Sequence, residues 1–132
     1  MFREFDDYLN LEFLADYWYD EGTGIASRML CKFAQQDWME LKEQCLSRAD
    51  PWKIRCAEVL ELVSHPVSRD VLVEFLASQN DDVVVAAADS LRSKDEVHLT
   101  LDSIERLRRL SAHGSAPVKA VLSRFLSQLG AA

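Results

Sequence analysis

The residue types that most often carry out chemistry are present in this chain, but they lack the spacing that chemistry needs. A structural or catalytic metal site would require Cys and His ligands a few residues apart, as in CxxC or HExxH. The cysteines and histidines are instead spread singly along the chain, at Cys31, Cys45, Cys56, His65, His98 and His113. The sequence also contains no glycine-rich phosphate loop and no GxSxG motif. We therefore expect no catalytic centre, no metal and no cofactor.

Carboxylates are abundant, but their pattern favours a solvated surface over acid–base chemistry. General acid–base catalysis needs two groups whose surroundings push their pKa values apart. Pairs such as Asp6 and Asp7, or Asp81 and Asp82, fall on the expected outer faces of helices. We therefore predict that the chain is not an enzyme.

The negative charge is concentrated at the N-terminal end. The chain has a formal net charge of −7 from 22 acids and 15 bases. Residues 1–21 hold seven acids and one base, a net of −6, which leaves −1 for all other residues. The seven acids are Glu4, Asp6, Asp7, Glu12, Asp16, Asp20 and Glu21. This distribution disfavours direct binding to nucleic acid or to an anionic membrane, and favours a basic protein partner.

Length and composition indicate one helical domain over residues 1–132. The chain has 132 residues, of which 48% are hydrophobic, with only 4 Gly and 3 Pro to form turns. No apolar run is long enough to cross a bilayer, and the acidic N-terminus differs from a secretory signal. We expect a cytoplasmic location, with the cysteines as small buried thiols in a reducing compartment.

Polar breaks divide the chain into eight expected helices, arranged in four antiparallel pairs. Pro51, Pro66 and Pro117 each suit the first turn of a helix, and Asp50, Ser115 and Asn80 or Asp81 are plausible N-caps. The expected pairs are 2–19 with 23–35, 37–48 with 50–64, 66–77 with 80–93, and 95–112 with 115–129. The first of these helices is the acidic, aromatic N-terminal segment, and repeats are expected over 22–129.

One helical pattern recurs along the chain. In DDVVVAAADSL, Val83 is followed by Ala86, Ala87 and Ala88, and then by Leu91, eight residues after Val83. The same frame begins at Trp52 in DPWKIRCAEVL, at Val118 in APVKAVLSRFL and, more loosely, at Ile25 in TGIASRMLCKF. Residues eight positions apart lie on nearly the same face of a helix, and small residues between them allow a neighbouring helix to approach closely.

This pattern resembles the HEAT-repeat family over residues 23–129. The second helix of a HEAT repeat typically opens with Asp-Pro or a similar pair, followed by an aliphatic residue, an Ala-rich patch and a Leu. The segment from Asp81 to Leu91 matches closely, and the segment from Asp50 to Leu60 is next. Val84 stands where the family usually has Arg. The resemblance implies an all-α fold, a short right-handed α-solenoid, and a binding role without naming a partner.

The N-terminal segment is the first candidate binding surface. Residues 1–21 hold seven of the chain's 12 aromatic side chains, on two apolar stripes of one expected helix. One stripe can pack on the next helices, and the other needs a kink near Asn10, self-association or a partner. Aromatic residues among acids are typical of a hot spot for a cationic protein, although a solvated capping helix explains them equally. The candidate residues are Asp6, Asp7, Asp16, Tyr17, Trp18, Tyr19, Asp20 and Glu21.

Two further surfaces come from the repeated helices. Positions pointing away from the core on consecutive repeats are Ile54, Glu58, Glu61, Val85 and Asp89, which would continue an acidic, partly apolar docking face unless a loop covers Ile54 and Val85. A basic cluster at Arg106, Arg108, Arg109 and Arg124 could contact phosphate. We interpret it instead as helix electrostatics, because Asp102 and Glu105 precede Arg106 and Arg109 by one turn.

These observations together predict a non-catalytic protein-binding module. A small, acidic, helical repeat chain looks most like a bacterial immunity protein or antitoxin that occludes a basic toxin such as a nuclease. The alternatives are a scaffold or adaptor subunit of a larger complex and, from another class, a HEAT-like lyase or chaperone acting on a cofactor-bearing protein. We expect a monomer or a weak dimer.

Overall fold

The computed structural model describes residues 1–130, and over that range it is helical with no strand. The longer helices are α1 (Phe2–Leu9), α3 (Thr23–Cys31), α4 (Gln35–Gln44), α5 (Asp50–Leu60), α6 (Pro66–Phe75), α7 (Asp81–Leu91), α8 (Leu101–His113) and α9 (Ala116–Gln128). Shorter elements are α2 (Ala15–Tyr17), the π-helical segment η1 (Trp18–Gly22) and the 3₁₀ turn η2 (Cys45–Ser47). Within the described part of the chain, no helix has the length and apolar character needed to span a membrane.

Polar side chains and prolines set the beginnings of several helices. As predicted, Pro51, Pro66 and Pro117 lie in the first turns of α5, α6 and α9. The predicted cap Asn80 accepts hydrogen bonds from the backbone N–H groups of Asp82 and Val83 at 2.9 and 3.3 Å. Asp50, by contrast, is the first residue of α5 and Ala49 is its N-cap. The sequence therefore predicts where these helices begin, but it does not identify every N-cap residue correctly.

The expected helix over 2–19 is interrupted. α1 ends at Leu9, the backbone is extended at Leu14 with φ −69° and ψ 143°, and a helix resumes at Ala15. α1 buries Phe2, Phe5 and Leu9, whereas Trp18 is buried after the break. A single straight helix presents only one apolar stripe to the core. The break lets Trp18 be buried as well as the α1 residues, while Leu11 and Leu14 between them stay 52% and 82% exposed. The expected helix over 95–112 also begins later, at Leu101, after Glu96 adopts a left-handed backbone with φ 57°.

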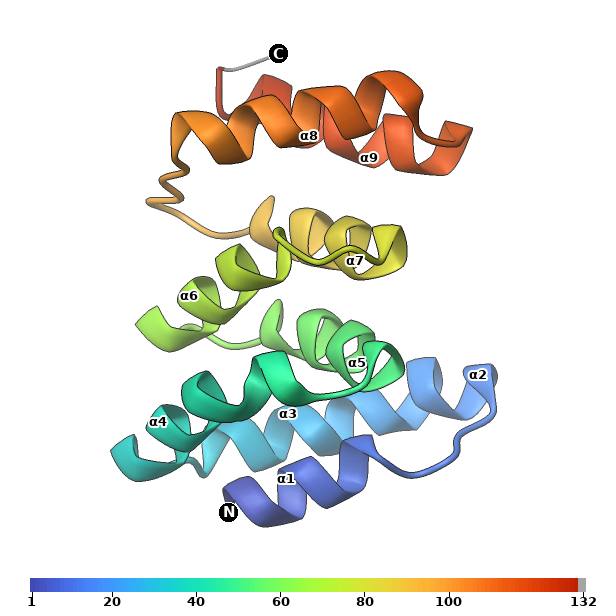
Figure 1. Ribbon diagram of the computed structural model, residues 1–132. Helices are drawn as coiled ribbons and strands as arrows, with labels where there is room; N and C mark the ends of the chain where they lie inside the picture. The colour runs from blue at the N-terminus through green and yellow to red at the C-terminus, as the bar shows by residue number, and fades with distance from the viewer. Residues whose placement is uncertain (131–132) are drawn as a thin grey trace.

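Helices α3, α5, α7 and α9 lie in one row, each in contact with the next, and α4 packs against α6 beside that row (Figure 1). The small residues of the recurring frame lie where these helices meet. Ala57, Ala87 and Ala88 are fully buried. The Ser90 hydroxyl on α7 donates to the carbonyl of Ala57 on α5 at 2.7 Å. Close approach between neighbouring helices is therefore achieved through small side chains, as the frame predicts.

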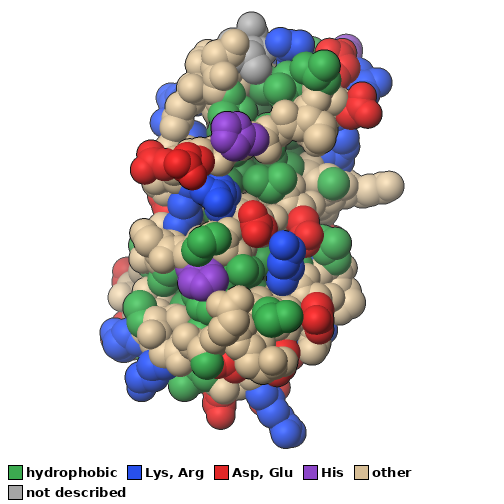
Figure 2. Space-filling view, turned by 90° about the vertical axis from the view of Figure 1, so that its left-hand side faces the viewer, with side chains coloured by type: hydrophobic (Ala, Val, Ile, Leu, Met, Phe, Trp, Pro, Cys, Tyr) green, Lys and Arg blue, Asp and Glu red, His purple; other side chains and the backbone are tan. Residues whose placement is uncertain are grey.

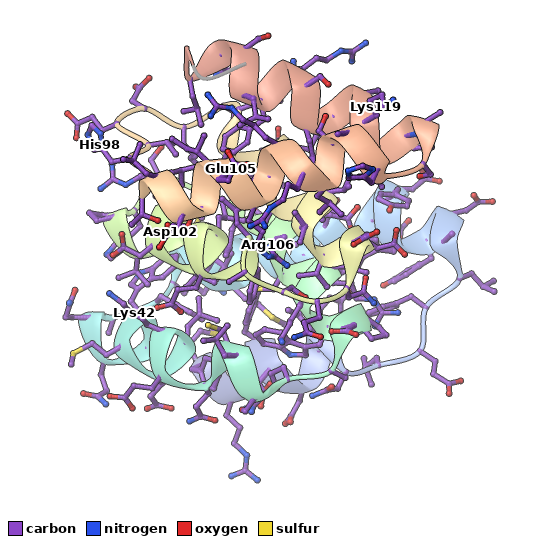
Figure 3. The ribbon with its side chains drawn as sticks, turned by 45° about the horizontal axis from the view of Figure 1, so that its top comes forward. Lys42, His98, Asp102, Glu105, Arg106 and Lys119 are labelled. Atoms are coloured by element: carbon purple, nitrogen blue, oxygen red, sulfur yellow. The ribbon has the colours of Figure 1, made fainter. Side chains whose placement is uncertain are left out.

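Three basic side chains cap helix C-termini by donating hydrogen bonds to backbone carbonyls. Arg55 donates to Leu9 at the end of α1 and to Leu11 beyond it. Lys94 donates to Glu61 and Val63 beyond α5, and Arg106 donates to Leu76 and Ser78 beyond α6. Carbonyls at a helix C-terminus lack intrahelical partners, so a cation there supplies both hydrogen bonds and favourable charge. Arg106, which projects from α8 toward the preceding layer (Figure 3), therefore has a structural role at the end of α6, in place of the charge pairing within its own helix that the sequence predicts.

Two of the three cysteines are buried, as expected, and the third is not. Cys45 and Cys56 are buried while Cys31 is exposed. Burial, together with the nearby Glu74 carboxylate, raises the pKa of the Cys45 thiol to about 12. Burial also raises the pKa of Cys56 well above its ordinary value. Both buried thiols are therefore protonated and unreactive, and act as small apolar side chains.

Candidate functional site

A concave surface with a volume of about 410 Å³ lies between η1, α5, α7 and α9. Its lining is Tyr19, Thr23, Glu58, Glu61, Leu62, Asp82, Val85, Ala86, Asp89, Ser90 and Val121, and we refer to it as the acidic groove. Four of these side chains are carboxylates, and Leu62, Val85, Ala86 and Val121 supply an apolar surface among them. The groove therefore combines negative charge with apolar contact area.

Helical periodicity places these groups on the groove. On α7, Asp82, Val85 and Asp89 are separated by three and four residues and form one stripe. The opposite face of α7 is buried through Val84, Ala87 and Leu91, so the acidic stripe faces outward. The seven residues from Asp82 to Asp89 rise about 10 Å along the helix. The carboxylates are thus spread along the groove.

Among the described residues that line it, the groove has four carboxylates and no Lys or Arg side chain. Burial, followed by repulsion from Asp89, raises the pKa of Glu61. Arg92 pairs with Asp89 at 3.3 Å, and Lys94 donates to backbone carbonyls of the α5 end. No three potential ligands among the His, Cys, Asp and Glu side chains of residues 1–130 are arranged to hold a metal ion. Spread carboxylates of this kind suit several separate cationic groups better than one ion.

Glu58 joins the groove to the N-terminal segment. Its carboxylate accepts hydrogen bonds from the Trp18 indole at 3.2 Å and from the Tyr19 hydroxyl at 2.7 Å. The hydrogen bond to Glu58 also raises the pKa of Tyr19. Tyr19 is 60% exposed, whereas Trp18 is only 4% exposed. Tyr19 therefore remains a possible contact for a partner, but Trp18 is a core residue and the expectation that it inserts into a partner is corrected.

A second, smaller pocket of about 260 Å³ adjoins the acidic groove and shares Tyr19 and Glu58 with it. Ile54 and Phe13 are among its lining residues. The Phe13 ring stacks on Tyr17 with centroids 5.5 Å apart, and the Arg55 guanidinium lies 4.8 Å from the Phe13 centroid. Ile54 and Val85, expected on one row, thus lie in adjoining pockets, and both are half-buried.

The remaining acids predicted in the N-terminal segment do not line the acidic groove. Asp6 accepts two hydrogen bonds from Arg48, each 2.8 Å long, so it is a structural ion-pair residue and not the free partner contact expected for it. The other four, Asp7, Asp16, Asp20 and Glu21, are exposed outside the groove. Tyr17 is 38% exposed above Phe13. Of the predicted N-terminal residues, Tyr19 and the buried Trp18 both hydrogen-bond Glu58 of that row, and Tyr19 alone lines the acidic groove among the described residues.

Sequence reasoning missed six groove residues, namely Thr23, Leu62, Asp82, Ala86, Ser90 and Val121. Asp82 could have been predicted from the sequence, because it lies seven residues before Asp89 and shares its helical face. Val121 could not have been predicted, because its position depends on how α9 packs against α7. The face of the molecule shown in Figure 2 differs from the groove, because acidic and basic side chains are interspersed on it.

Comparison of the chain with protein-family models, with curated proteins and with solved structures gives no match. Its function is therefore inferred from the groove and from the charges around it.

Proposed function

We propose that this chain is a non-catalytic protein-binding module whose acidic groove holds a basic segment of another protein. The proposal depends chiefly on one observation: four carboxylates and four apolar side chains share one concave surface. The side chains of Lys and Arg have apolar stems and charged ends. Their stems fit against Leu62, Val85 and Val121, while their charged ends reach Glu61, Asp82 or Asp89.

We further propose that the architecture is a short right-handed α-solenoid of HEAT type, with four antiparallel helical pairs. The contact row α3–α5–α7–α9 and the recurring frame support this proposal. Solenoids commonly bind partners along the surface formed by one row of their helices. The acidic groove lies on the row formed by α5, α7 and α9.

The specific role we propose is that of a bacterial immunity protein or antitoxin that occludes a basic toxin. The net charge of −7 supports a cationic partner. Four exposed acids outside the groove, Asp7, Asp16, Asp20 and Glu21, extend the negative field and would accelerate encounter with such a protein. An adaptor subunit would use the same groove, and the identity of the captured partner distinguishes the two roles.

The test uses the purified chain as bait in a lysate of its source cells, followed by titration calorimetry with the captured protein. The variant Glu61→Lys with Asp89→Lys reverses two exposed groove charges. We expect at least a tenfold loss of affinity, and a weaker dependence on salt, because the two groove charges provide attraction that salt screens.

The matched control is Glu43→Lys with Asp102→Lys. These acids are exposed and lie outside the groove. Both double variants raise the net charge of −7 by four units, so a general charge effect would weaken both equally. Equal affinities for the two variants, or a captured partner with an acidic surface, would overturn the proposed site.

A further inference from the structure

The two ends of the molecule carry opposite charge. Residues 101–128, which contain α8 and α9, hold five bases and two acids, a net of +3. The total of −7 therefore leaves −10 for the other residues. The two helices form the top layer in Figure 1, whereas α1 lies at the bottom.

The basic end has a groove of its own, with a volume of about 270 Å³. Its lining is Arg108, Ser111, Ala112, Lys119, Ser123, Leu126 and Ser127, and we refer to it as the end groove. All of these residues belong to α8 or α9, so the groove involves no side chain of α7 or of any earlier helix. The Ser111 and Ser123 hydroxyls are 3.0 Å apart and link the two helices across it. Lys119, labelled on α9 in Figure 3, and Arg108 provide cations beside the apolar Ala112 and Leu126. Arg108 also lies 3.8 Å from the Glu105 carboxylate, and Leu126 is only 3% exposed.

The complementary feature is the segment 11–16, between α1 and η1. Leu14 is 82% exposed on extended backbone, and Leu11 is 52% exposed. Glu12 and Asp16, two residues to either side of Leu14, are both exposed. Burial of these two apolar side chains against another surface would be favourable. The segment thus presents an apolar side chain flanked by carboxylates.

We propose that the end groove of one molecule receives segment 11–16 of a second copy of the chain. Leu14 packs over Ala112 and the accessible edge of Leu126, and the flanking carboxylates pair with Lys119 and, in competition with Glu105, with Arg108. The segment and the end groove are far apart in one molecule (Figure 1), so the contact forms between copies. Two different surfaces meet in this contact, so it repeats head to tail and produces chains of more than two copies. This inference uses no residue of the acidic groove, and of the residues named in the proposed function it shares only Asp16.

The first test is sedimentation velocity of the full chain from ~10 µM to ~1 mM at low salt. We expect the mean sedimentation coefficient to rise with concentration beyond that of a dimer, and to rise less at high salt. Leu14→Ser should weaken association about tenfold or more, because the buried apolar contact is lost. Leu101→Ser is the control, since Leu101 is 84% exposed and does not line the end groove.

The second test reverses charges. Arg108→Glu with Lys119→Glu should abolish self-association, whereas Arg28→Glu with Lys32→Glu, exposed on or beside α3 with the same change in net charge, should not. A variant carrying Glu12→Lys and Asp16→Lys should not associate with itself, but should associate with the Arg108→Glu, Lys119→Glu variant. A wild-type chain that stays monomeric over this range, or equal association of Leu14→Ser and Leu101→Ser, would overturn the inference.

Discussion

The hydroxyl of Tyr19 donates a hydrogen bond of 2.7 Å to the Glu58 carboxylate, across the boundary between the N-terminal segment and α5. The other oxygen of the same carboxylate accepts from the buried indole of Trp18. Glu58 therefore does two things at once. It contributes negative charge to the acidic groove, and it holds the segment that forms one edge of that groove.

Glu58→Ala should destabilise the fold more than Glu61→Ala does. Without Glu58, the buried Trp18 indole N–H loses its acceptor, which costs about 1–3 kcal/mol. Glu61 accepts no comparable side-chain hydrogen bond from a buried group and is exposed, so its replacement should change stability by less than about 0.5 kcal/mol. Urea denaturation followed by tryptophan fluorescence measures both. Equal destabilisation would show that the Trp18 contact contributes little.

Gly22→Ala and Gly24→Ala should change stability in opposite directions. A Cβ at Gly22 would lie 2.6 Å from Cε3 of the Trp18 ring, which is itself packed in the core. The resulting clash should cost about 1–3 kcal/mol. A Cβ at Gly24 would meet only the end of the flexible Arg28 side chain, at 3.6 Å. Because alanine favours helix, Gly24→Ala should stabilise by about 0.5–1 kcal/mol. Thermal melting of both variants distinguishes these outcomes, and a stabilised Gly22→Ala would contradict the close packing on Trp18.

The ion pair between Asp6 and Arg48 should be stronger than the pair between Lys42 and Asp70. Asp6 and Arg48 are 18% and 21% exposed and form two hydrogen bonds, both 2.8 Å long. A double-mutant cycle with Asp6→Ala and Arg48→Ala should give a coupling energy of about 1–2 kcal/mol. The matched pair is 3.5 Å apart and nearly half exposed, so its coupling energy should stay below about 0.5 kcal/mol. Similar coupling energies for the two pairs would refute the structural role assigned to Asp6.

Asp37 should make stability depend on pH. Its carboxylate accepts hydrogen bonds from the backbone N–H groups of Ala34, at 2.8 Å, and Phe2, at 3.1 Å, and these lower its pKa below the ordinary value of 3.8. The native carboxyl therefore releases its proton more readily than the unfolded one. The stabilisation is complete above pH 3.8 and is lost as the pH falls through the lowered native pKa.

Asp37→Asn should therefore reduce the free energy of unfolding at neutral pH, by about 1–2 kcal/mol. The difference from wild type should shrink as the pH falls below the ordinary value of an aspartate. Urea denaturation over a series of acidic pH values measures it. A difference that does not vary with pH would mean that charge at Asp37 is irrelevant and that only the shape of the side chain matters.

The sequence by itself determined which side chains share a helical face. The spacing of Val83, Ala87 and Leu91 predicts the buried side of α7, and the prolines predict where three helices begin. The same periodicity places Glu58, Glu61 and Asp89 on outer faces, so three of the four carboxylates of the acidic groove could be predicted. This information is local, because the helical repeat of 3.6 residues fixes directions within one element.

Only the tertiary structure decided which rows face one another and which acids are already paired. Asp6 meets Arg48 from 42 residues away, and Trp18 meets Glu58 from 40 residues away. Neither contact can be predicted from the local pattern of residues. The break after Leu9 also depends on the tertiary structure. Whether one helix can bury two apolar stripes is decided by where the neighbouring helices lie, and the local sequence does not show this. Distances between elements depend on packing of the whole core, which periodicity within a single helix does not specify.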